Sequence, residues 1–394
     1  MLLVWLAISL LVVGGAMVFG ALGARHPDAG GLYVYLREGW GDRLAAVYGW
    51  ECLLVMDPGV FAALATGVQP YVVAIWPGLA GSERWVALAV IWGVVAISMT
   101  GVRLSARTMV ALTAVKLLAL AAVIVRSFAD RGGQWAHFAA VRGQSTDAIS
   151  LAPAMALAAI AVFFSFGGFW DTSRIADRVR NPERTLPRTM TLGVACVALV
   201  YVLTTMAFIY LLPVSEAQDA QAFAGLVGIR LFGAAGAPLF AAIVALSVVT
   251  SALGLAMFAP RLYSAMAVDG VLPGLAIDER PGRLVLASVA SVLAWRVGFI
   301  GILTFFMAPT LVFVGLAALS VMRPASNAGA TRSVDDPAVH PPSPAIAAAL
   351  FASLLAMVVV LVAVNQPWQA GAGFAVTAAG ALAAARLGQR RTAA

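Results

Sequence analysis

Residues 163–170 read Phe163-Phe164-Ser165-Phe166-Gly167-Gly168-Phe169-Trp170 and end the apolar run 151–170. That run is long enough to cross about 30 Å of hydrocarbon as a helix. The two adjacent glycines cost a helix about 2 kcal/mol relative to alanine, and non-helical backbone at membrane depth persists only where it lines a cavity or is buried in protein. The stretch therefore predicts a helix broken over a polar site or, as an equal alternative, a close-packed glycine pair at a helix crossing. If the helix is broken over a polar site, the C-terminal end of the helix 151–164 would direct the negative end of its dipole at the ammonium group of a substrate.

The rest of the chain has the composition of a membrane protein. It is 62% hydrophobic and 11% charged, with a mean hydropathy of +0.94, whereas soluble domains average about 45–50% apolar and about 25% charged residues. A soluble fold of 394 residues could not keep so much apolar surface from water. The arginines are scattered between apolar runs rather than gathered in a basic stripe, which argues against nucleic-acid binding.

Apolar runs of helical length predict an all-α, polytopic membrane protein with about eleven transmembrane helices. The first run has no basic residues before it and is longer than the apolar part of a signal peptide, so we interpret it as a retained span. The runs cover residues 2–22, 44–73, 85–102, 105–125, 151–170, 189–212, 237–258, 284–295, 300–321, 345–364 and 374–387.

The basic residues predict the orientation of these spans. If the connection after the first run is cytoplasmic, 18 of the 25 basic residues fall on the cytoplasmic side and 6 on the other, with Lys116 inside a run. This bias follows the positive-inside rule. It predicts a multi-pass protein of the cell (inner) membrane with a cytoplasmic C-terminus and with Met1 outside.

Ionisable residues inside the apolar runs are candidate site residues, because charge at membrane depth is costly and usually functional. Lys116, the single lysine of the chain, lies eleven residues beyond Ser105, which is about 16 Å along a helix. Asp57 lies twelve residues beyond Ala45, about 18 Å from the same face, so the two could interact. The alternatives are snorkelling to an interface for Lys116 and a structural role for Asp57. Glu51, nearer the cytoplasmic end, is expected to be solvated or capped.

Four polar segments connect the runs. Residues 25–41 contain an amphipathic stretch that could lie along the cytoplasmic face, and residues 171–188 are expected to form a solvated loop. The cluster 261–270 could pair across helix ends as a gate, although ordinary loop charge explains it nearly as well. Residues 323–344 are rich in Pro, Ser, Ala and Asp and predict a flexible linker.

The chain shows no enzyme motif. It has no phosphate-binding glycine loop, no metal-binding histidine pair and no set of serine, histidine and carboxylate within a run. Its three histidines all lie in polar connections, and its two cysteines show no paired spacing. The sequence therefore predicts neither an enzyme nor a bound metal or other cofactor.

Four motifs together resemble the amino acid–polyamine–organocation superfamily, and most closely its bacterial L-type amino acid permeases. The resemblance runs from about residue 2 to residue 387. The motifs are residues 27–37 (Pro-Asp-Ala-Gly-Gly-Leu-Tyr-Val-Tyr-Leu-Arg), 164–168 (Phe-Ser-Phe-Gly-Gly), 181–184 (Asn-Pro-Glu-Arg) and the segment 261–273.

The resemblance implies a LeuT-like fold of two inverted five-helix repeats with two helices appended, and transport of amino acids by alternating access. On this chain the repeats correspond to 1–128 and 151–322. The segment 323–344 is then a linker, and 345–387 is the trailing helix pair, all within a single membrane domain.

The resemblance also assigns roles to site residues. The stretch that holds the substrate amino group corresponds to the backbone of Phe163, Phe164, Ser165, Phe166, Gly167 and Gly168. The aromatic gate over the substrate corresponds to Phe164. Lys116 matches the lysine that takes the place of a sodium ion, which implies sodium-independent transport by exchange, uniport or proton coupling.

One part of the family pattern is absent from these residues. The family's first helix, whose glycine-rich break receives the substrate carboxylate, has no counterpart, and the run 2–22 matches the family's second helix. The expected partners are an amino acid, neutral by default and cationic if Asp57 selects for charge, and the lipid bilayer. The competing interpretation is a truncated, non-transporting remnant or a sensor on a permease scaffold. The sequence carries no prediction of oligomeric state.

Overall fold

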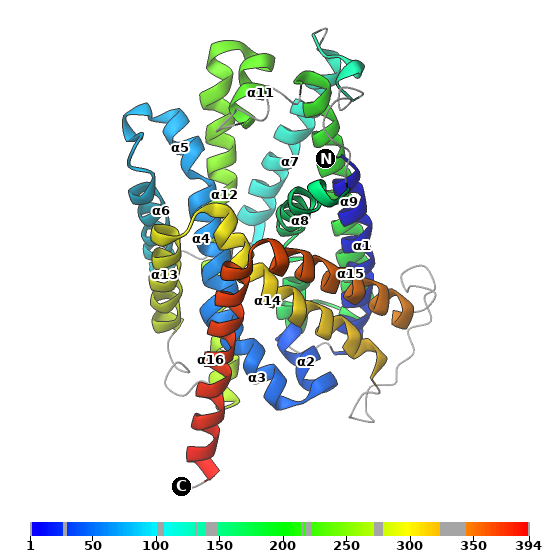
Figure 1. Ribbon diagram of the computed structural model, residues 1–394, viewed down its shortest axis with the longest axis vertical. Coiled ribbons are helices and arrows are strands. Elements are labelled where there is room, and N and C mark those ends of the chain that lie inside the picture. The colour runs from blue at the N-terminus through cyan, green and yellow to red at the C-terminus, as the bar shows by residue number, and fades with distance from the viewer. Residues whose placement is uncertain are drawn as a thin grey trace.

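The computed structural model describes residues 2–26, 30–100, 106–130, 132–138, 148–213, 216, 223–271, 279–323 and 344–392. Within these residues every regular element is a helix (Figure 1). The described residues of each predicted apolar run lie mainly on helices, which confirms the all-α prediction. The predicted linker, apart from its two ends, lies outside the described residues.

The first half of the chain forms seven α-helices and three short helices of other types. They are α1 (Leu2–Arg25), α2 (Leu32–Trp40), α3 (Asp42–Glu51), the π-helical η1 (Cys52–Met56), α4 (Asp57–Gly67), α5 (Gln69–Ile75), the 3-10 helix η2 (Pro77–Leu79), α6 (Glu83–Met99), α7 (Ala106–Ala129) and the 3-10 helix η3 (Trp135–Phe138).

The second half contains the longest helices. They are α8 (Ala148–Ser165), the 3-10 helix η4 (Phe169–Arg178), α9 (Pro182–Leu211), α11 (Phe223–Phe232), the 3-10 helix η5 (Gly233–Ala235), α12 (Gly236–Val268), α13 (Glu279–Arg296), α14 (Phe299–Leu319), the 3-10 helix η6 (Ser320–Met322), α15 (Pro344–Asn365) and α16 (Pro367–Thr392).

Eight segments of the described residues are long and apolar enough to cross a membrane, which confirms a polytopic membrane protein. The helices α6, α13 and α16 are not among these segments. α6 has 17 residues, and α13 begins and ends with charged side chains. That these three helices also cross the membrane therefore stays a prediction, and so does the total of about eleven transmembrane helices.

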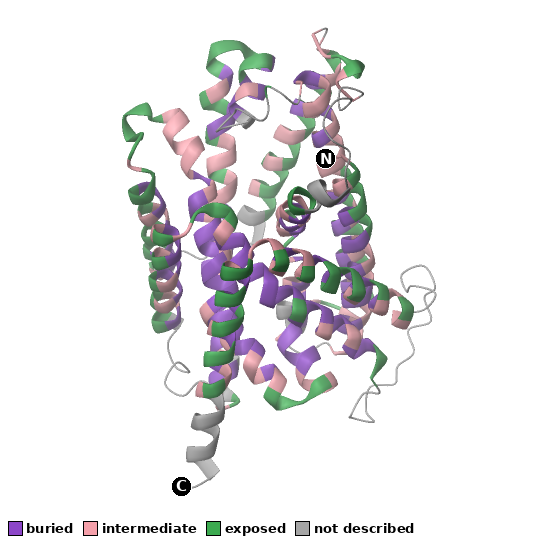
Figure 2. Cartoon of the chain, viewed as in Figure 1, coloured by how far each residue is buried: buried purple, intermediate pink, exposed green. Residues whose placement is uncertain are grey.

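The core of the bundle surrounds α14, in which 15 of 21 residues are buried. This helix packs against α15, α16, α4 and α8. Figure 2 shows buried residues concentrated on α4 and α14 and exposed residues on the outer faces of α13, α15 and α16. Large apolar side chains stand on those outer faces, for example Val292, Val360 and Leu382. Apolar exposure of this kind suits a surface that contacts lipid tails rather than water.

The predicted run 44–73 is not one continuous α-helix. It winds as α3, the π turn η1, α4 and α5, which follow one another along the long axis of the molecule (Figure 1). π turns of this kind occur often at functional sites. Beyond the turn, α4 approaches α14 closely at Gly59, where a Cβ atom would lie 2.5 Å from Cβ of Phe306. A glycine at this position therefore permits the contact between the two helices.

The expectation of a solvated loop at 171–188 is wrong. Residues up to Arg178 form η4, and α9 begins at Pro182. Pro182 at the first helical position has no N–H to satisfy, and its ring presets the helical φ. Ser173 on η4 is fully buried and donates its hydroxyl to the carbonyl of Trp170. The segment is thus part of the packed bundle.

Candidate functional site

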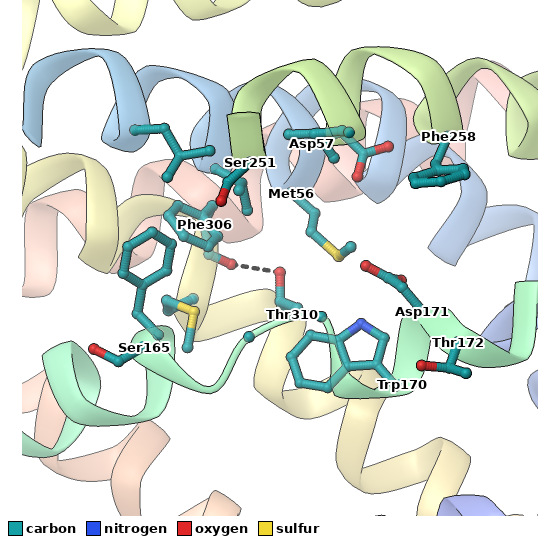
Figure 3. A pocket seen from close by; sticks show the side chains of 18 of the residues that line it. Met56, Asp57, Ser165, Trp170, Asp171, Thr172, Ser251, Phe258, Phe306 and Thr310 are labelled. Carbon is teal, nitrogen blue, oxygen red and sulfur yellow. Dashed lines mark hydrogen bonds between the residues drawn. The ribbon is translucent and has the colours of Figure 1, made fainter. Parts of the chain in front are cut away.

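A cavity of about 620 Å³ lies inside the helix bundle. It is lined by α4, α7, α12 and α14, and by the segment that leads from the end of α8 into η4. Figure 3 shows side chains from these elements, among them Asp57, Ser251, Thr310 and Asp171, around one space. Apolar walls with a few convergent polar groups are typical of a site for a small molecule.

The helix break predicted at the glycine pair is present. α8 ends at Ser165, residues 166–168 form a turn, and η4 follows. Gly168 has a φ of 90°, in the left-handed region that favours glycine. A residue with a side chain would be strained there. The sequence Gly167-Gly168 therefore determines where the helix stops.

The end of α8 presents backbone acceptors beside the cavity. The carbonyl of Phe164 accepts from the amide of Gly167 at 2.8 Å. The carbonyl of Ser165 accepts from the hydroxyl of Tyr201 on α9 at 3.0 Å. Because a carbonyl oxygen has two lone pairs, each can accept a second hydrogen bond. The negative end of the helix dipole and these oxygens together favour a positively charged group.

The six residues predicted for this stretch divide between two sides of the chain. Four of them line the cavity: Phe164, Ser165, Gly167 and Gly168. Phe164 meets Phe306 of α14 edge to face, with 5.8 Å between ring centroids.

The other two turn their side chains elsewhere. Phe163 is fully buried and stacks on Trp170 at 6.2 Å. Phe166 packs against Trp5 and Tyr201 at 6.2 and 5.2 Å, and it lines a second cavity of about 350 Å³ beside α9. Of these two residues, only the backbone remains a candidate for the predicted substrate-binding stretch.

Lys116 and Asp57 both line the cavity, as candidate site residues should, but each has its own hydrogen-bond partner. The Lys116 ammonium on α7 donates to the carbonyl of Ser247 on α12 at 3.1 Å. The Asp57 carboxylate accepts from the hydroxyl of Tyr263 on α12 at 2.8 Å. Both residues of the first half of the chain are therefore held by the same helix of the second half. Ser247 carried no signal in the sequence, and Tyr263 lay within the predicted cluster 261–270 without an assigned partner.

Asp171 is a cavity residue that the sequence interpretation missed, because it was assigned to a solvated loop. It lies in the first turn of η4, directly after Trp170. Figure 3 shows its carboxylate pointing from η4 toward Met56 of η1. Its position in the sequence could have identified it as a cavity residue, since Asp171 is the first charged residue after the predicted break.

Glu51 is fully buried, which contradicts the expectation that it is solvated or capped. It is the last residue of α3, directly before the π turn, and its Oε1 lies 2.6 Å from the hydroxyl of Thr310 on α14. Thr310 in turn lines the cavity. The run of apolar residues after Glu51 was visible in the sequence, but the contact with α14 was not.

The segment 261–270 pairs with the short helix α2. Asp269 accepts from the hydroxyl of Tyr33 at 2.9 Å and forms an ion pair with Arg37 at 3.3 Å. Burial, and then the hydrogen bond to Asp269, raises the pKa of Tyr33, so its hydroxyl stays protonated and remains a donor at neutral pH. The predicted pairing across helix ends is present between α2 and the end of α12. The side chain of Arg261 lies outside the described part of the chain.

The cavity offers groups that bind rather than groups that react. A lysine, two carboxylates, hydroxyls and helix-end carbonyls can hold an ammonium group and a polar or charged second group by hydrogen bonds. Within the described residues, no three His, Cys, Asp or Glu side chains lie together in a way that could hold a metal ion.

Comparison with known proteins agrees with these features. A family model described as amino acid permease matches residues 1–383. The b(0,+)-type amino acid transporter 1 of Mus musculus is 28% identical over 68% of this chain and 55% of its own length. The serine/threonine exchanger SteT of Bacillus subtilis is 25% identical over 69% of this chain and 61% of its own length. An uncharacterized transporter of Mycobacterium tuberculosis is 30% identical over 82% of this chain and 72% of its own length. The match thus spans little more than half the length of the first two relatives.

Proposed function

The chain belongs to the amino acid permease family, and from this premise we propose that it is a secondary transporter that moves amino acids across the cell membrane by alternating access. The observation that carries the proposal is the helix break at Gly167-Gly168, which opens on a cavity large enough for an amino acid. Broken helices that line a cavity at membrane depth are a recurrent substrate site in transporters. The two relatives with assigned activities are an amino acid transporter and a serine/threonine exchanger.

In this proposal the substrate α-amino group binds at the end of α8. The carbonyls of Phe164 and Ser165 and the helix dipole supply the negative side of the site. The Phe164 ring, in edge-to-face contact with Phe306, closes over the substrate as an aromatic gate. Asp57 and Asp171 make a cationic side chain acceptable, while neutral amino acids remain the first substrates to test.

Transport is proposed to be independent of sodium. Lys116 places an ammonium group at the wall of the cavity, in hydrogen-bond contact with a backbone carbonyl of α12. Backbone carbonyls of this kind coordinate sodium ions in sodium-coupled transporters, and an ammonium group that already occupies one disfavours a second cation. Two inverted repeats, 1–128 and 151–322, and a cytoplasmic C-terminus in the inner membrane complete the proposed arrangement.

The test is exchange of labelled amino acids in proteoliposomes. Vesicles that contain the purified protein and one unlabelled amino acid should take up the same labelled amino acid, with and without sodium, at equal rates. Phe164→Ala should lower the exchange rate, whereas Phe128→Ala, the same change in the aromatic cluster with Trp135 and Tyr210, should not. If the folded protein exchanges no member of an amino acid panel, the proposed transport is wrong and a non-transporting scaffold is the better interpretation.

A further inference from the structure

A second polar contact of the bundle lies one hydrogen bond away from the cavity. Glu51 ends α3 and is fully buried, as is Thr310 apart from 1% of its surface. The two side chains join α3 to α14, in which 15 of 21 residues are buried. Carboxyl groups placed inside a membrane bundle are costly, and where they occur they mark ion or proton pathways by default.

The contacts of Thr310 suit a proton on Glu51. The Thr310 hydroxyl oxygen lies 2.7 Å from the carbonyl oxygen of Phe306, one turn earlier on α14 (Figure 3), and 2.6 Å from Oε1 of Glu51. A hydroxyl carries one proton, and a backbone carbonyl cannot donate. One hydroxyl proton can be shared between two acceptors, as at Thr66, but two separate hydrogen bonds need two protons. When Thr310 donates to the carbonyl of Phe306, a protonated Glu51 can donate the second hydrogen bond to the Thr310 oxygen.

The surroundings of Glu51 agree with a neutral carboxyl group. α14, which faces it, contains no titratable side chain. The titratable residues nearest to it along its own run are Tyr48, Cys52 and Asp57, and the helices α12 and α13 that also pack here contribute Tyr263 and Arg283. Asp57 accepts from Tyr263, and Nε of Arg283 donates to the carbonyl of Ala256.

Further titratable groups stand toward the ends of these elements. α2 and the start of α3 bear Tyr33, Tyr35, Arg37, Glu38, Asp42 and Arg43. Asp269 directly follows α12, and α13 bears Arg280 and Arg296. Arg37 is engaged by Asp269. The described side chains of α16 include no charged group.

We propose that Glu51 is the proton-binding site of this protein and that loading and unloading of its proton couples amino acid movement to the proton gradient. The proposal rests on the transport function above and adds its coupling ion. Thr310 is the positioning residue: its hydroxyl lies between the cavity and the carboxyl group, so a movement of α14 relative to α3 exposes the Glu51 proton to water that enters the cavity. Glu51 takes up its proton from cavity water while the cavity is open on one side of the membrane, and releases it to cavity water while the cavity is open on the other.

The first experiment separates exchange from gradient-driven uptake in proteoliposomes. Glutamine resembles the protonated acid in shape and donates an amide hydrogen, so Glu51→Gln should retain exchange to within about twofold and lose all stimulation of uptake by an imposed pH gradient. Glu216→Gln makes the same chemical change at an exposed residue and should keep both activities.

The second experiment tests the role of Thr310. Thr310→Ser keeps the hydroxyl and should keep the stimulation by the pH gradient. Thr310→Val removes the hydroxyl and should lower the stimulation by the pH gradient by a much larger factor than it lowers exchange, since Thr310 also lines the cavity. A purely structural contact would instead make both activities fall together in Thr310→Val.

A direct readout covers the case in which the variants fail to fold. In the wild-type protein with ¹³C-labelled glutamate, the infrared spectrum at neutral pH should show a protonated-carboxyl stretch that shifts with the label. Exposed glutamates are ionised at that pH. Absence of this band overturns the inference.

The outcomes distinguish the two proposals. Exchange by the wild type without stimulation by a pH gradient, or unchanged stimulation in Glu51→Gln, overturns the proton site and leaves amino acid transport standing. Absence of exchange in the folded wild type overturns both. Retained exchange with lost stimulation in Glu51→Gln, together with the labelled carboxyl band, supports the proton site.

Discussion

At the scale of single residues, three polar contacts at the wall of the cavity join different helices, beside hydroxyls that bond within their own helix. Lys116 on α7 reaches Ser247 on α12, Asp57 on α4 accepts from Tyr263 on α12, and Thr310 on α14 meets Glu51 on α3. Each contact joins parts of the chain at least 131 residues apart. Relative movement of these helices must therefore break or exchange polar contacts at the wall of the cavity.

Lys116→Ala should lower amino acid exchange about tenfold, because it removes the contact between α7 and α12 and a hydrogen bond from a charged group contributes about 1.5–3 kcal/mol. The measurement is the initial exchange rate in proteoliposomes. The matched control is Arg126→Gln on the same helix, whose half-exposed ion pair with Asp130 is worth at most about 1 kcal/mol. Equal rates for Lys116→Ala and the wild type would remove Lys116 from the site.

Residue depth could be predicted from the sequence, and residue partners could not. Counting along the apolar runs placed Lys116 and Asp57 at one level, and both do line one cavity. Which group each one contacts depends on how the helices rotate and pack, and a single sequence does not specify this. The same reason explains Glu51, whose burial follows from the position of α14 and not from its own neighbours in the chain.

At the scale of elements, the break between α8 and η4 positions seven of the residues that line the cavity, from Phe164 to Thr172. The glycine pair predicted the break itself, since few other residues tolerate the φ of 90° at Gly168. The sequence did not predict the 3-10 helix after it. Residues 169–178 alternate charged and apolar side chains without a clear helical period, and their burial depends on contacts with α9, α1 and α2.

Gly168→Ala should destabilise the protein by about 1–2 kcal/mol, because a side chain at positive φ carries a cost of that order, and it should also lower exchange. The matched control is Gly93→Ala on α6, where a Cβ atom would meet nothing within 4 Å. In a helix interior that change should be neutral or stabilising, by up to about 1 kcal/mol. The measurement is the midpoint of thermal unfolding in detergent. An unfolding midpoint for Gly168→Ala at or above that of Gly93→Ala would contradict the strained turn.

At the scale of the whole molecule, the short helix α2 ties the two halves of the chain together at their predicted cytoplasmic ends. Tyr33 and Arg37 both engage Asp269 at the end of α12. On its other side, Trp40 donates its indole N–H to the carbonyl of Leu316 on α14 at 2.9 Å. The amphipathic pattern predicted a surface helix here, yet all residues from Leu32 to Leu36 are buried against the bundle. A helix held in this way closes that end of the bundle.

Asp269→Asn should open the cytoplasmic end more often, because it removes an ion pair and weakens the acceptor for Tyr33. A loss of about 1 kcal/mol shifts a conformational equilibrium about fivefold. The readout is labelling of Ser251→Cys, which lines the cavity, by a membrane-impermeant maleimide added from the cytoplasmic side, in a background without Cys52 and Cys196. The rate should rise several-fold.

The control for this prediction is Asp130→Asn, the same chemical change in the surface pair with Arg126. It should leave the labelling rate of Ser251→Cys unchanged. A labelling rate in Asp269→Asn equal to that of the control would show that the contact of α2 with α12 does not limit access.

The π turn at Cys52–Met56 sets the angle about the helix axis between the buried side chains of Glu51 and Asp57, which flank it. Each residue advances an α-helix by about 100°. Deletion of one residue from this turn would restore α-helical pitch and swing Glu51 by about that angle away from Thr310, while Asp57 kept its place against Tyr263. The extra residue of the π turn thus lets one continuous helical segment contact Thr310 through Glu51 and Tyr263 through Asp57. A homologous chain without this residue would need its acidic side chain at another position of α3 to contact the same threonine hydroxyl.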